Sequence, residues 1–495
     1  MLAVFRHALI FGLGPVLQKA ASLVLLPLYT HHLTPADYGE IELLTLLVGF
    51  FAVVFCFEYR QGYIRALTKK QDKDENSDMV SASILFFVIT ALAGSACFAI
   101  ALPFFGDIAL GYRVGAGYGA ILLLGLFADI MNFLLMATAQ ARLWSARMVT
   151  LGLIQFVIGT GLSVYLIVFM EFGPVSLFIG NTVGSLLAML ALLTMLRGDL
   201  VRPAAWKATV APVLAYSAPL LIGALLYFVL RLVDRIVISE YLSLDDLGIY
   251  SMSWKISGLL LTFMFMPFVK SFDVWRFRFY EEKNRTDDVA DIARVFIAGI
   301  AASSLVLATF GADLFLLVAD RRYHDAVFLL PVLNAAVILQ CCYSISAAAF
   351  FVSGATKPWF MILAVGTAIQ VSGSLILVQL IGLQGAGISM LFANLAIYLI
   401  TIRVAPRYWR VPYQHGLFAL IIGAVFILSL AKNLWPQENL LTSLAMDTAI
   451  LIVFLGLSIT LKAVRKEEIR QGISIATNLV HRKIGKLTGR TVPRD

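Results

Sequence analysis

Residues 33–39 read Leu-Thr-Pro-Ala-Asp-Tyr-Gly, and residues 242–248 repeat the pattern as Leu-Ser-Leu-Asp-Asp-Leu-Gly. Each stretch lies between two long apolar runs, so each is a short polar loop that joins two helices. Asp37 and Asp246 are placed where a carboxylate can cap the free backbone N–H groups at the start of the following helix. The same helical hairpin is therefore expected twice in the chain.

The apolar runs around these loops are long enough to cross a membrane. Of the 495 residues, 60% are hydrophobic and 14% are charged, and the mean hydropathy is +0.88. Soluble domains carry about 25% charged residues, and a spanning helix needs about 20 mostly apolar residues. The sequence thus predicts an all-α polytopic membrane protein with about fourteen transmembrane helices. Their expected positions are residues 8–29, 41–62, 79–104, 117–139, 148–170, 174–196, 212–235, 247–269, 294–318, 326–352, 358–381, 385–403, 415–431 and 440–461.

The position of the repeat predicts how these helices are grouped. The two loops fall between the first and second spans and between the seventh and eighth, so the repeat unit has six spans and keeps its orientation. This arrangement predicts two pseudo-symmetric six-helix lobes, at 1–205 and 206–410, that face each other across a central cavity. Two additional transmembrane helices at 411–462 and a basic cytoplasmic tail at 463–495 complete the expected domain organisation.

The cationic residues indicate the orientation in the membrane. If the N-terminus is cytoplasmic, the loops on the opposite side contain few Lys or Arg residues, namely Arg113, Arg321, Arg322 and Lys432. Cytoplasmic loops are the ones that carry an excess of Lys and Arg, so both termini are expected inside. The net charge of +8 is then a feature of membrane topology, and no nucleic-acid partner is expected. The tail suits either a helix lying on an anionic leaflet or a disordered basic segment.

Together, the 33–39 loop, the stretch DRIVISEYLSLDDLGIYS at 234–251 and the layout of six, six and two helices resemble a known family. They are similar to the polysaccharide-biosynthesis flippases, which include O-antigen-type flippases, of the multidrug/oligosaccharidyl-lipid/polysaccharide exporter superfamily. The resemblance implies a protein that moves an undecaprenyl-pyrophosphate-linked oligosaccharide or exopolysaccharide precursor across the bacterial cytoplasmic (inner) membrane by alternating access. Other members of the superfamily export drugs by cation antiport, and that alternative stays open.

Several charged residues lie inside the predicted spans, where each costs about 2.5–3.5 kcal/mol and therefore needs a polar cavity or a partner. The residues that we predict to line a substrate cavity are Lys19, Asp129, Arg231, Asp234, Arg235 and Lys255. Lys and Arg are suitable partners for a pyrophosphate group. Softer polar groups for the sugars are Gln18, Asn132, Gln155, Asn181, Asn334, Gln340, Gln370 and Asn394.

Two of these assignments have alternatives. Arg231, Asp234 and Arg235 share one helical face and also suit an ion pair between helices. Asp129 suits either neutralisation of Lys19 or the binding of a coupling proton.

A second charged group lies toward the cytoplasmic end of the second span. Glu58, Arg60 and Arg65 are predicted to form a cytoplasmic entrance to the cavity. The alternative for Glu58 and Arg60 is an interfacial position in which the long side chains reach out to the headgroups.

Motifs for chemistry are missing from the sequence. It contains no Gly-x-x-x-x-Gly-Lys-[Ser/Thr] loop, no His or Cys spacing typical of a metal site, and no long outside loop for sugar chemistry. We therefore expect a transporter without cofactor or metal rather than an enzyme. A membrane-embedded glycan polymerase or glycosyltransferase is the alternative from another class. The expected partners are the lipid-linked oligosaccharide, the lipid bilayer and other glycan-assembly membrane proteins.

Overall fold

The computed structural model describes residues 17–22, 24–69, 73–142, 144–203, 205–281, 285–435 and 439–463. All regular elements in these ranges are helical, and thirteen helices are long and apolar enough to cross a membrane. The prediction of an all-α polytopic membrane protein is confirmed. Residues 8–16 and 23 of the first predicted span, 8–29, lie outside the described residues, as does the predicted basic tail from residue 464 onward.

The helices follow the predicted spans closely. In the first half they are α2 (Leu26–His32), α3 (Pro35–Cys56), α4 (Tyr59–Lys69), α5 (Lys73–Phe105), the π-helical η1 (Gly106–Leu110), α6 (Ala116–Ala141), α7 (Ser145–Val168), α8 (Val175–Leu196) and the short η2 (Arg197–Asp199). In the second half they are α9 (Trp206–Tyr241), α10 (Leu244–Leu260), the π-helical η3 (Leu261–Phe265), α11 (Met266–Glu281), α12 (Thr286–Val306), the π-helical η4 (Leu307–Gly311), α13 (Ala312–Val318), η5 (Arg321–Leu329), α14 (Leu330–Ser346), α15 (Ala348–Val352), α16 (Thr356–Ile381), α17 (Leu383–Val404), η6 (Ala405–Arg407), α18 (His415–Leu434) and α19 (Leu440–Thr460).

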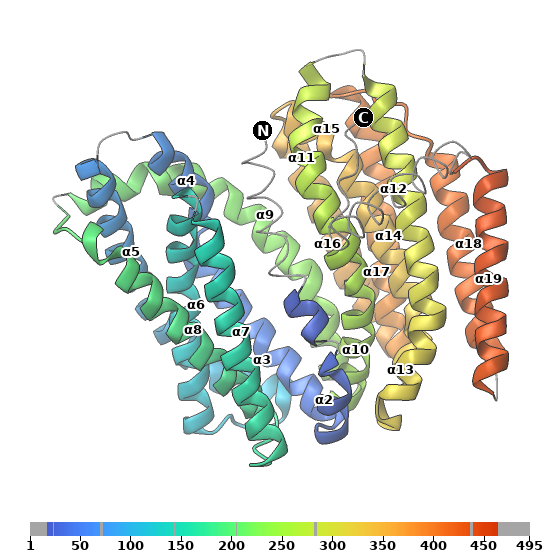
Figure 1. Cartoon of the computed structure of the whole chain (residues 1–495), viewed down its shortest axis with the longest axis horizontal. Coiled ribbons are helices and arrows are strands. Elements are labelled where there is room, and N and C mark those ends of the chain that lie inside the picture. Colours follow the sequence, from blue (N-terminus) through green and yellow to red (C-terminus); the bar gives the residue numbers. More distant parts are fainter. Residues whose placement is uncertain are drawn as a thin grey trace, which may run out of the picture.

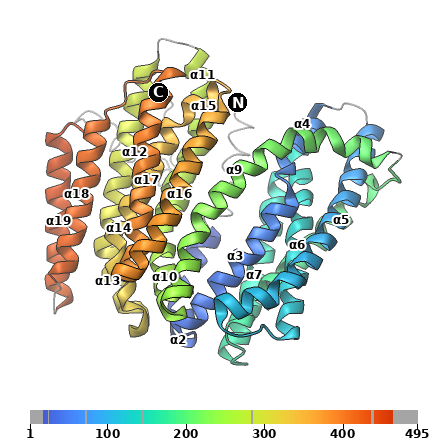
Figure 2. The same cartoon turned by 180° about the vertical axis from the view of Figure 1, so that it is seen from behind.

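The helices form two groups that stand side by side (Figure 1). Helices α3 to α8 make the first group and α10 to α17 the second, with α18 and α19 at the outer edge of the second group. The two groups approach each other at the end where α2, α3 and α10 meet, and they diverge toward the end that carries α4 and α11 (Figures 1 and 2). The cavity described below lies between the groups.

Helix α9 connects the two groups. Its first half packs on α4, where Gly62 lies against the Val213 backbone and the Ser217 side chain. From its middle onward it packs on α16, where Gly223 lies against the ring of Phe360. The division of the chain into lobes at residues 205 and 410 therefore remains a prediction, because α9 belongs to both groups by its contacts.

The second predicted span, 41–62, is displaced in the structure. Helix α3 begins earlier, at Pro35, because Thr34 and Asp37 form a reciprocal capping box and a proline is favoured in the first helical turn. It ends at Cys56, since Phe57 and Glu58 adopt left-handed conformations with φ of 53° and 50°. The predicted carboxylate cap is present at Asp37, which accepts a hydrogen bond from the Thr34 backbone N–H. At the start of α10 the cap is instead the Ser243 side chain, which accepts from the Asp246 backbone N–H, while the Asp246 carboxylate accepts from the Ser243 hydroxyl.

The two copies of the repeated loop contact each other in space. A Cβ atom added to Gly39 would lie 2.2 Å from the carbonyl oxygen of Leu244, and one added to Gly248 would lie 1.8 Å from that of Pro35. These two contacts are equivalent under the repeat, which relates Pro35 to Leu244 and Gly39 to Gly248. The backbone N–H of Ala36 also donates to a carboxylate of the other copy, Asp245 Oδ1, at 3.0 Å. We call this junction of residues 35–39 and 244–248 the repeat contact.

Helices α18 and α19 are fixed to the second group at both of their ends. At one end Lys432 on α18 lies 3.2 Å from Asp313 on α13 and 2.6 Å from Asp447 on α19. At the other end the buried guanidinium of Arg294 on α12 donates to the carbonyl of Ala463 at 2.8 Å, just beyond α19. The additional helices are therefore attached to the second group by polar contacts as well as by packing.

Lys432 is expected to be needed for stable attachment of α18 and α19. The Lys432→Met variant leaves the side chains of Asp313 and Asp447 in a largely buried position without their cation. Removing one partner of a buried ion pair costs about 3–5 kcal/mol, so we expect a lower thermal unfolding temperature of the purified protein in detergent. The double variant Lys432→Met/Asp447→Asn is expected to recover part of the loss, and an unchanged unfolding temperature in the single variant contradicts this role.

Candidate substrate cavity

A cavity of about 800 Å³ lies between the two groups of helices. Its wall is formed by residues 19 and 22 near the start of the described chain and by side chains of α2, α3, α8, α9, α10, η3, α11, α14 and α17. This volume is within the range of about 300–1,000 Å³ that is typical of ligand sites. The cavity is therefore large enough for a polar headgroup.

The structure brings five of the six predicted cavity residues to this wall, namely Lys19, Arg231, Asp234, Arg235 and Lys255. Among all its lining residues the cavity has four cationic side chains and two carboxylates, Asp234 and Glu42. The wall carries an excess of positive charge.

Arg235 is the most constrained of these cations. Its side chain is 2% exposed, and its Nη1 lies 2.7 Å from Oδ2 of the equally buried Asp234. The guanidinium also lies over the rings of Tyr250 and Trp254, at 5.1 and 5.2 Å from their centroids. Asp234 and Arg235 thus form an ion pair within α9, whereas the alternative stated from the sequence was an ion pair between helices.

Arg235 also joins the two groups of helices. Its Nε lies 3.4 Å from Oε1 of Glu42, which is on α3 in the first group. Glu42 was not among the cavity residues predicted from the sequence. The available signal was the spacing of Tyr38, Ile41, Glu42 and Thr45, which places all four on one face of α3, and this face lines the cavity.

The other three cations have no ion-pair partner among the described residues. Lys19 and Arg231 are exposed, and Arg231 lies 6.0 Å from the centroid of the Trp254 ring. Lys255 lines the cavity from α10, with its Nζ 5.4 Å from the centroid of the Tyr38 ring. These side chains are thus placed to pair with an anion in the cavity.

Neutral polar and aromatic groups complete the wall. Of the softer polar residues predicted from the sequence, Asn181, Gln340 and Asn394 are among the lining side chains. The Gln340 amide donates to the hydroxyl of Tyr227 at 3.2 Å, so it is held toward the cavity. Such groups suit hydroxyl-rich or planar ligands beside the charged residues.

Asp129 is not among the residues that line the cavity. It lies on α6 in the interior of the first group, and its Oδ1 accepts a hydrogen bond of 2.8 Å from Ser185 on α8. No ion pair with Lys19 occurs within the described residues. The predicted position of Asp129 within a spanning helix is confirmed, but the sequence carries no information on the direction in which its side chain points.

The three predicted entrance residues also lie away from the cavity wall. Glu58 is in the left-handed turn after α3, and Arg60 donates to Gln140 of α6 at 3.1 Å. Arg65 lies over the ring of Tyr216 on α9, 4.9 Å from its centroid. The three side chains thus have different surroundings, and their role at a cytoplasmic entrance stays a prediction.

The repeat contact is reinforced by further contacts between the groups at the same end. The hydroxyl of Tyr323 donates to the carbonyl of Leu33 at 2.9 Å, and its ring packs edge-on against that of Tyr38 at 5.6 Å. Nearby, hydrogen bonds from the Arg322 side chain hold the pKa of the Asp320 carboxyl below its usual range. This end of the cavity, which the charge distribution predicts to be outside, is where the two groups are joined.

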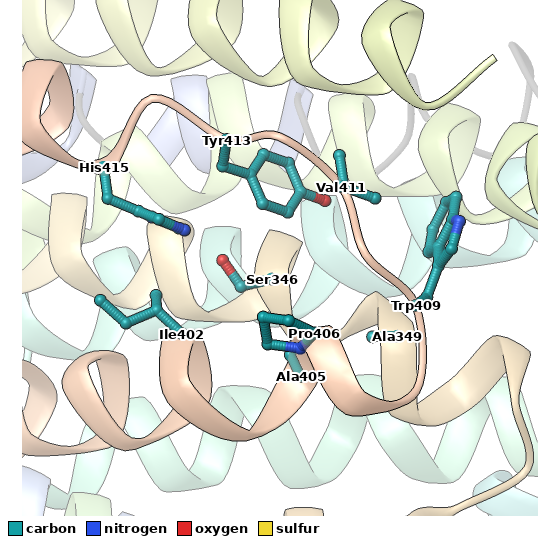
Figure 3. Close-up of a pocket in the computed structure, with 9 residues that line it drawn as sticks. All are labelled: Ser346, Ala349, Ile402, Ala405, Pro406, Trp409, Val411, Tyr413 and His415. Atoms are coloured by element: carbon teal, nitrogen blue, oxygen red, sulfur yellow. The ribbon is translucent and has the colours of Figure 1, made fainter. Parts of the chain in front are cut away.

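A second pocket at the opposite end of the second group is far smaller. It has a volume of about 10 Å³ and is lined by the nine residues labelled in Figure 3. That volume corresponds to roughly one water molecule. His415 at its edge is already engaged, since its Nδ1 lies 2.7 Å from the hydroxyl of Tyr398. The large cavity is therefore the candidate substrate site.

Comparison with known proteins supports the predicted fold of an all-α membrane transporter. Residues 31–272 match the family model described as "Polysaccharide biosynthesis protein". No curated protein sequence matches the chain.

Several solved structures are similar to this one. The lipid II flippase MurJ in an inward closed conformation has a TM-score of 0.70 at 11% identity, with 91% of this chain and 98% of that chain covered. An inward-facing multidrug resistance MATE family transporter of the MOP superfamily has a TM-score of 0.63 at 16% identity, covering 84% and 98%. A MOP superfamily transporter from Pyrococcus furiosus has a TM-score of 0.56 at 15% identity, covering 86% and 96%.

The predicted resemblance is thereby confirmed. The chain matches the polysaccharide biosynthesis protein family over residues 31–272 and has the fold of the MurJ and MATE proteins of the MOP superfamily.

Proposed function

We propose that this protein is a flippase that moves an undecaprenyl-pyrophosphate-linked oligosaccharide across the bacterial cytoplasmic membrane. The observation that carries the proposal is the positively charged cavity between two groups of membrane helices, in which Lys19, Arg231 and Lys255 have no ion-pair partner among the described residues. A pyrophosphate group brings the matching negative charge. In this proposal both termini are cytoplasmic, and the chain catalyses no chemical reaction.

The headgroup enters between the two groups of helices while the repeat contact holds them together at the outer end. Arg235 and Asp234 stay paired, whereas Lys19, Arg231 and Lys255 contact the pyrophosphate. The sugars lie against Asn181, Gln340, Asn394 and the aromatic side chains. The lipid tail remains in the bilayer, because moving only the headgroup avoids exposing apolar surface to water.

The ion pair between Glu42 and Arg235 links headgroup binding to opening. An anion near Arg235 repels Glu42 and competes with it for the same guanidinium. Since Glu42 and Arg235 belong to different groups of helices, weakening this pair favours their separation. The repeat contact then opens and exposes the headgroup to the outside.

Lys19 is expected to be required for transport but not for folding. The Lys19→Ala variant removes a cation that is exposed in the cavity, so headgroup binding weakens while the packing of the helices is unaffected. Loss of one charge-assisted contact corresponds to about 1.5–3 kcal/mol, so we expect transport to fall by roughly 10- to 150-fold. Normal surface glycan in a strain that carries only this variant at a matched expression level contradicts the role of Lys19.

The cellular test uses a strain that lacks this protein but has the upstream glycan-building enzymes. Lipid-linked oligosaccharides are extracted and analysed by mass, and a glycan-cleaving probe restricted to the periplasm reports which membrane face exposes them. We expect a complete precursor to accumulate on the cytoplasmic side and to become accessible when the protein is restored. Normal exposure of every precursor excludes the flippase and favours the cation-coupled exporter of small molecules, whereas an incomplete precursor favours a polymerase or glycosyltransferase.

A further inference from the structure

Cationic side chains gather at the end of the first group that carries α4, far from the repeat contact (Figures 1 and 2). They belong to two segments, the turn between α6 and α7 at 142–147 and the connection between α8 and α9 at 197–207. Together the two segments contain five Lys or Arg residues and a single carboxylate. The charge distribution of the chain predicts this end to be cytoplasmic. We call the two segments the cationic corner.

Most cations of this corner have no partner. Arg142 is the exception, since its guanidinium forms an ion pair with Asp199, the one carboxylate of the two segments. The other four side chains are exposed and form no ion pair within the part of the chain that the structure describes, namely Arg147, Arg197, Arg202 and Lys207. The corner therefore presents a positive charge that is not neutralised by the described protein.

Two tryptophan rings position these cations at a definite depth. The guanidinium carbon of Arg147 lies 5.1 Å from the centroid of the Trp144 ring, and Nζ of Lys207 lies 5.6 Å from that of Trp206. Both distances are within the range of cation–π contacts. Tryptophan is enriched at membrane–water interfaces, where its ring lies at the level of the lipid headgroups. A cation held over such a ring is at the depth of the lipid phosphates.

The two segments form one surface because both are fixed to the start of α5. The hydroxyl of Ser81 on α5 donates to the carbonyl of Asp199 at 3.2 Å. The hydroxyl of Thr209 in the first turn of α9 donates to the carboxylate of Asp78 at 3.3 Å. Asp78 and Ser81 are three residues apart and share one face of α5. The ion pair between Arg142 and Asp199 joins the turn between α6 and α7 to the same place.

Apolar side chains are exposed within the same surface. Leu200 and Val201 lie between two of the cations in the sequence and are each 47% exposed. Exposed apolar residues next to unpaired cations match the two parts of a phospholipid, its acyl chains and its phosphate. Arg and Lys are also the residues that pair best with phosphate.

We propose that the cationic corner binds an anionic phospholipid of the membrane leaflet on that side. The lipid phosphate pairs with the four unpaired cations, and its acyl chains lie against Leu200 and Val201. A zwitterionic lipid binds less well, because its own ammonium group repels these cations. The bound lipid holds the turn between α6 and α7 and the first turn of α9 at the membrane surface. This lipid is not the cargo, so the proposal does not depend on the proposed function.

Native mass spectrometry of the full-length protein tests this site. Protein stripped of lipid in detergent is titrated with phosphatidylglycerol and, separately, with phosphatidylcholine. The variant Arg147→Gln/Lys207→Gln is compared with the matched control Arg403→Gln/Arg407→Gln. The control removes two exposed cations near the end of α17, which lie over no aromatic ring among the described residues. Thermal unfolding verifies that both variants are folded.

Each cation near an anionic lipid surface strengthens binding by about 5-fold. We therefore expect phosphatidylglycerol to bind more tightly than phosphatidylcholine. Its affinity is expected to fall by about 25-fold in Arg147→Gln/Lys207→Gln and to stay unchanged in the control. Trp144→Leu keeps every charge and is expected to weaken binding by about 2- to 5-fold through the lost ring contacts.

Three results contradict the proposal. Equal binding of the two lipids shows that the corner does not recognise negative charge. Equal weakening in the variant and the control shows that the effect belongs to surface charge in general. Displacement of the lipid by water-soluble glycerol 3-phosphate at equal concentration shows that the corner binds a free phosphate rather than a lipid. Because no cargo is present, these results leave the flippase proposal to its own test.

Discussion

Replacing Arg235 with Gln is expected to abolish transport and to destabilise the protein by about 3–5 kcal/mol. The change leaves Asp234, which is 1% exposed, as a buried carboxylate without its cation. It also removes the contact with Glu42 that joins the two groups of helices and one of the four cations of the cavity wall. Thermal unfolding in detergent measures the loss of stability, and the cellular glycan assay measures transport.

The double variant Asp234→Asn/Arg235→Gln separates the two effects. A neutral pair of similar shape removes the uncompensated buried charge, so most of the stability is expected to return. Transport is not expected to return, because the link to Glu42 and the cavity cation are still missing. Recovery of normal transport in the double variant would show that Arg235 has a purely structural role.

Replacing Gly248 with Ala is expected to weaken the repeat contact and to expose the cavity to the outside. The added Cβ meets the carbonyl oxygen of Pro35 at 1.8 Å, so α3 and α10 have to move apart. Overpacking costs about 1–3 kcal/mol. This cost destabilises only the closed state, in which α3 and α10 touch at the repeat contact. The ratio of closed to open molecules is therefore expected to fall by about 5- to 150-fold.

Thiol labelling measures this shift directly. A cysteine is placed at the cavity-lining Ser251 in a chain whose four native cysteines are replaced by alanine, and a membrane-impermeant reagent is added from outside. We expect faster labelling and slower transport with Gly248→Ala. Gly423→Ala is the matched control, since nothing lies within 4 Å of the added Cβ on α18. Equal labelling rates in the two variants contradict the assignment of the repeat contact as the closed end.

Hydropathy was sufficient to predict most of the membrane helices. The expected span 358–381 is α16, Thr356–Ile381, and the expected span 174–196 is α8, Val175–Leu196. Helix α8 ends just before the charged Arg197, where the apolar run ends. Helix α16 ends at Gly382, whose φ of 63° breaks the chain between two apolar helices. The break at Phe57 and Glu58 was not predictable in the same way, since it depends on the left-handed backbone conformations of these two residues.

The candidate site was predictable in its composition but not in its full geometry. Intramembrane Lys and Arg residues pointed to the cavity, since such charges rarely face lipid. The same rule placed Asp129 there, although its side chain turns toward α8 inside the first group. Glu42 was missed because its contact with Arg235 joins residues 193 positions apart. Depth in the membrane can be read from sequence, whereas the direction of a side chain depends on how the helices pack.

The most direct test of the central claim is headgroup translocation by the purified protein in lipid vesicles. Vesicles contain a labelled undecaprenyl-pyrophosphate-linked oligosaccharide, and a glycan-cleaving enzyme outside them detects the headgroups that reach the outer leaflet. The positively charged cavity predicts that the wild-type protein makes the inner-leaflet headgroups accessible, and that Lys19→Ala and Asp234→Asn/Arg235→Gln do so far more slowly. Equal accessibility in vesicles without protein, or an unchanged rate in both variants, contradicts the claim that these cations carry an anionic headgroup across the membrane.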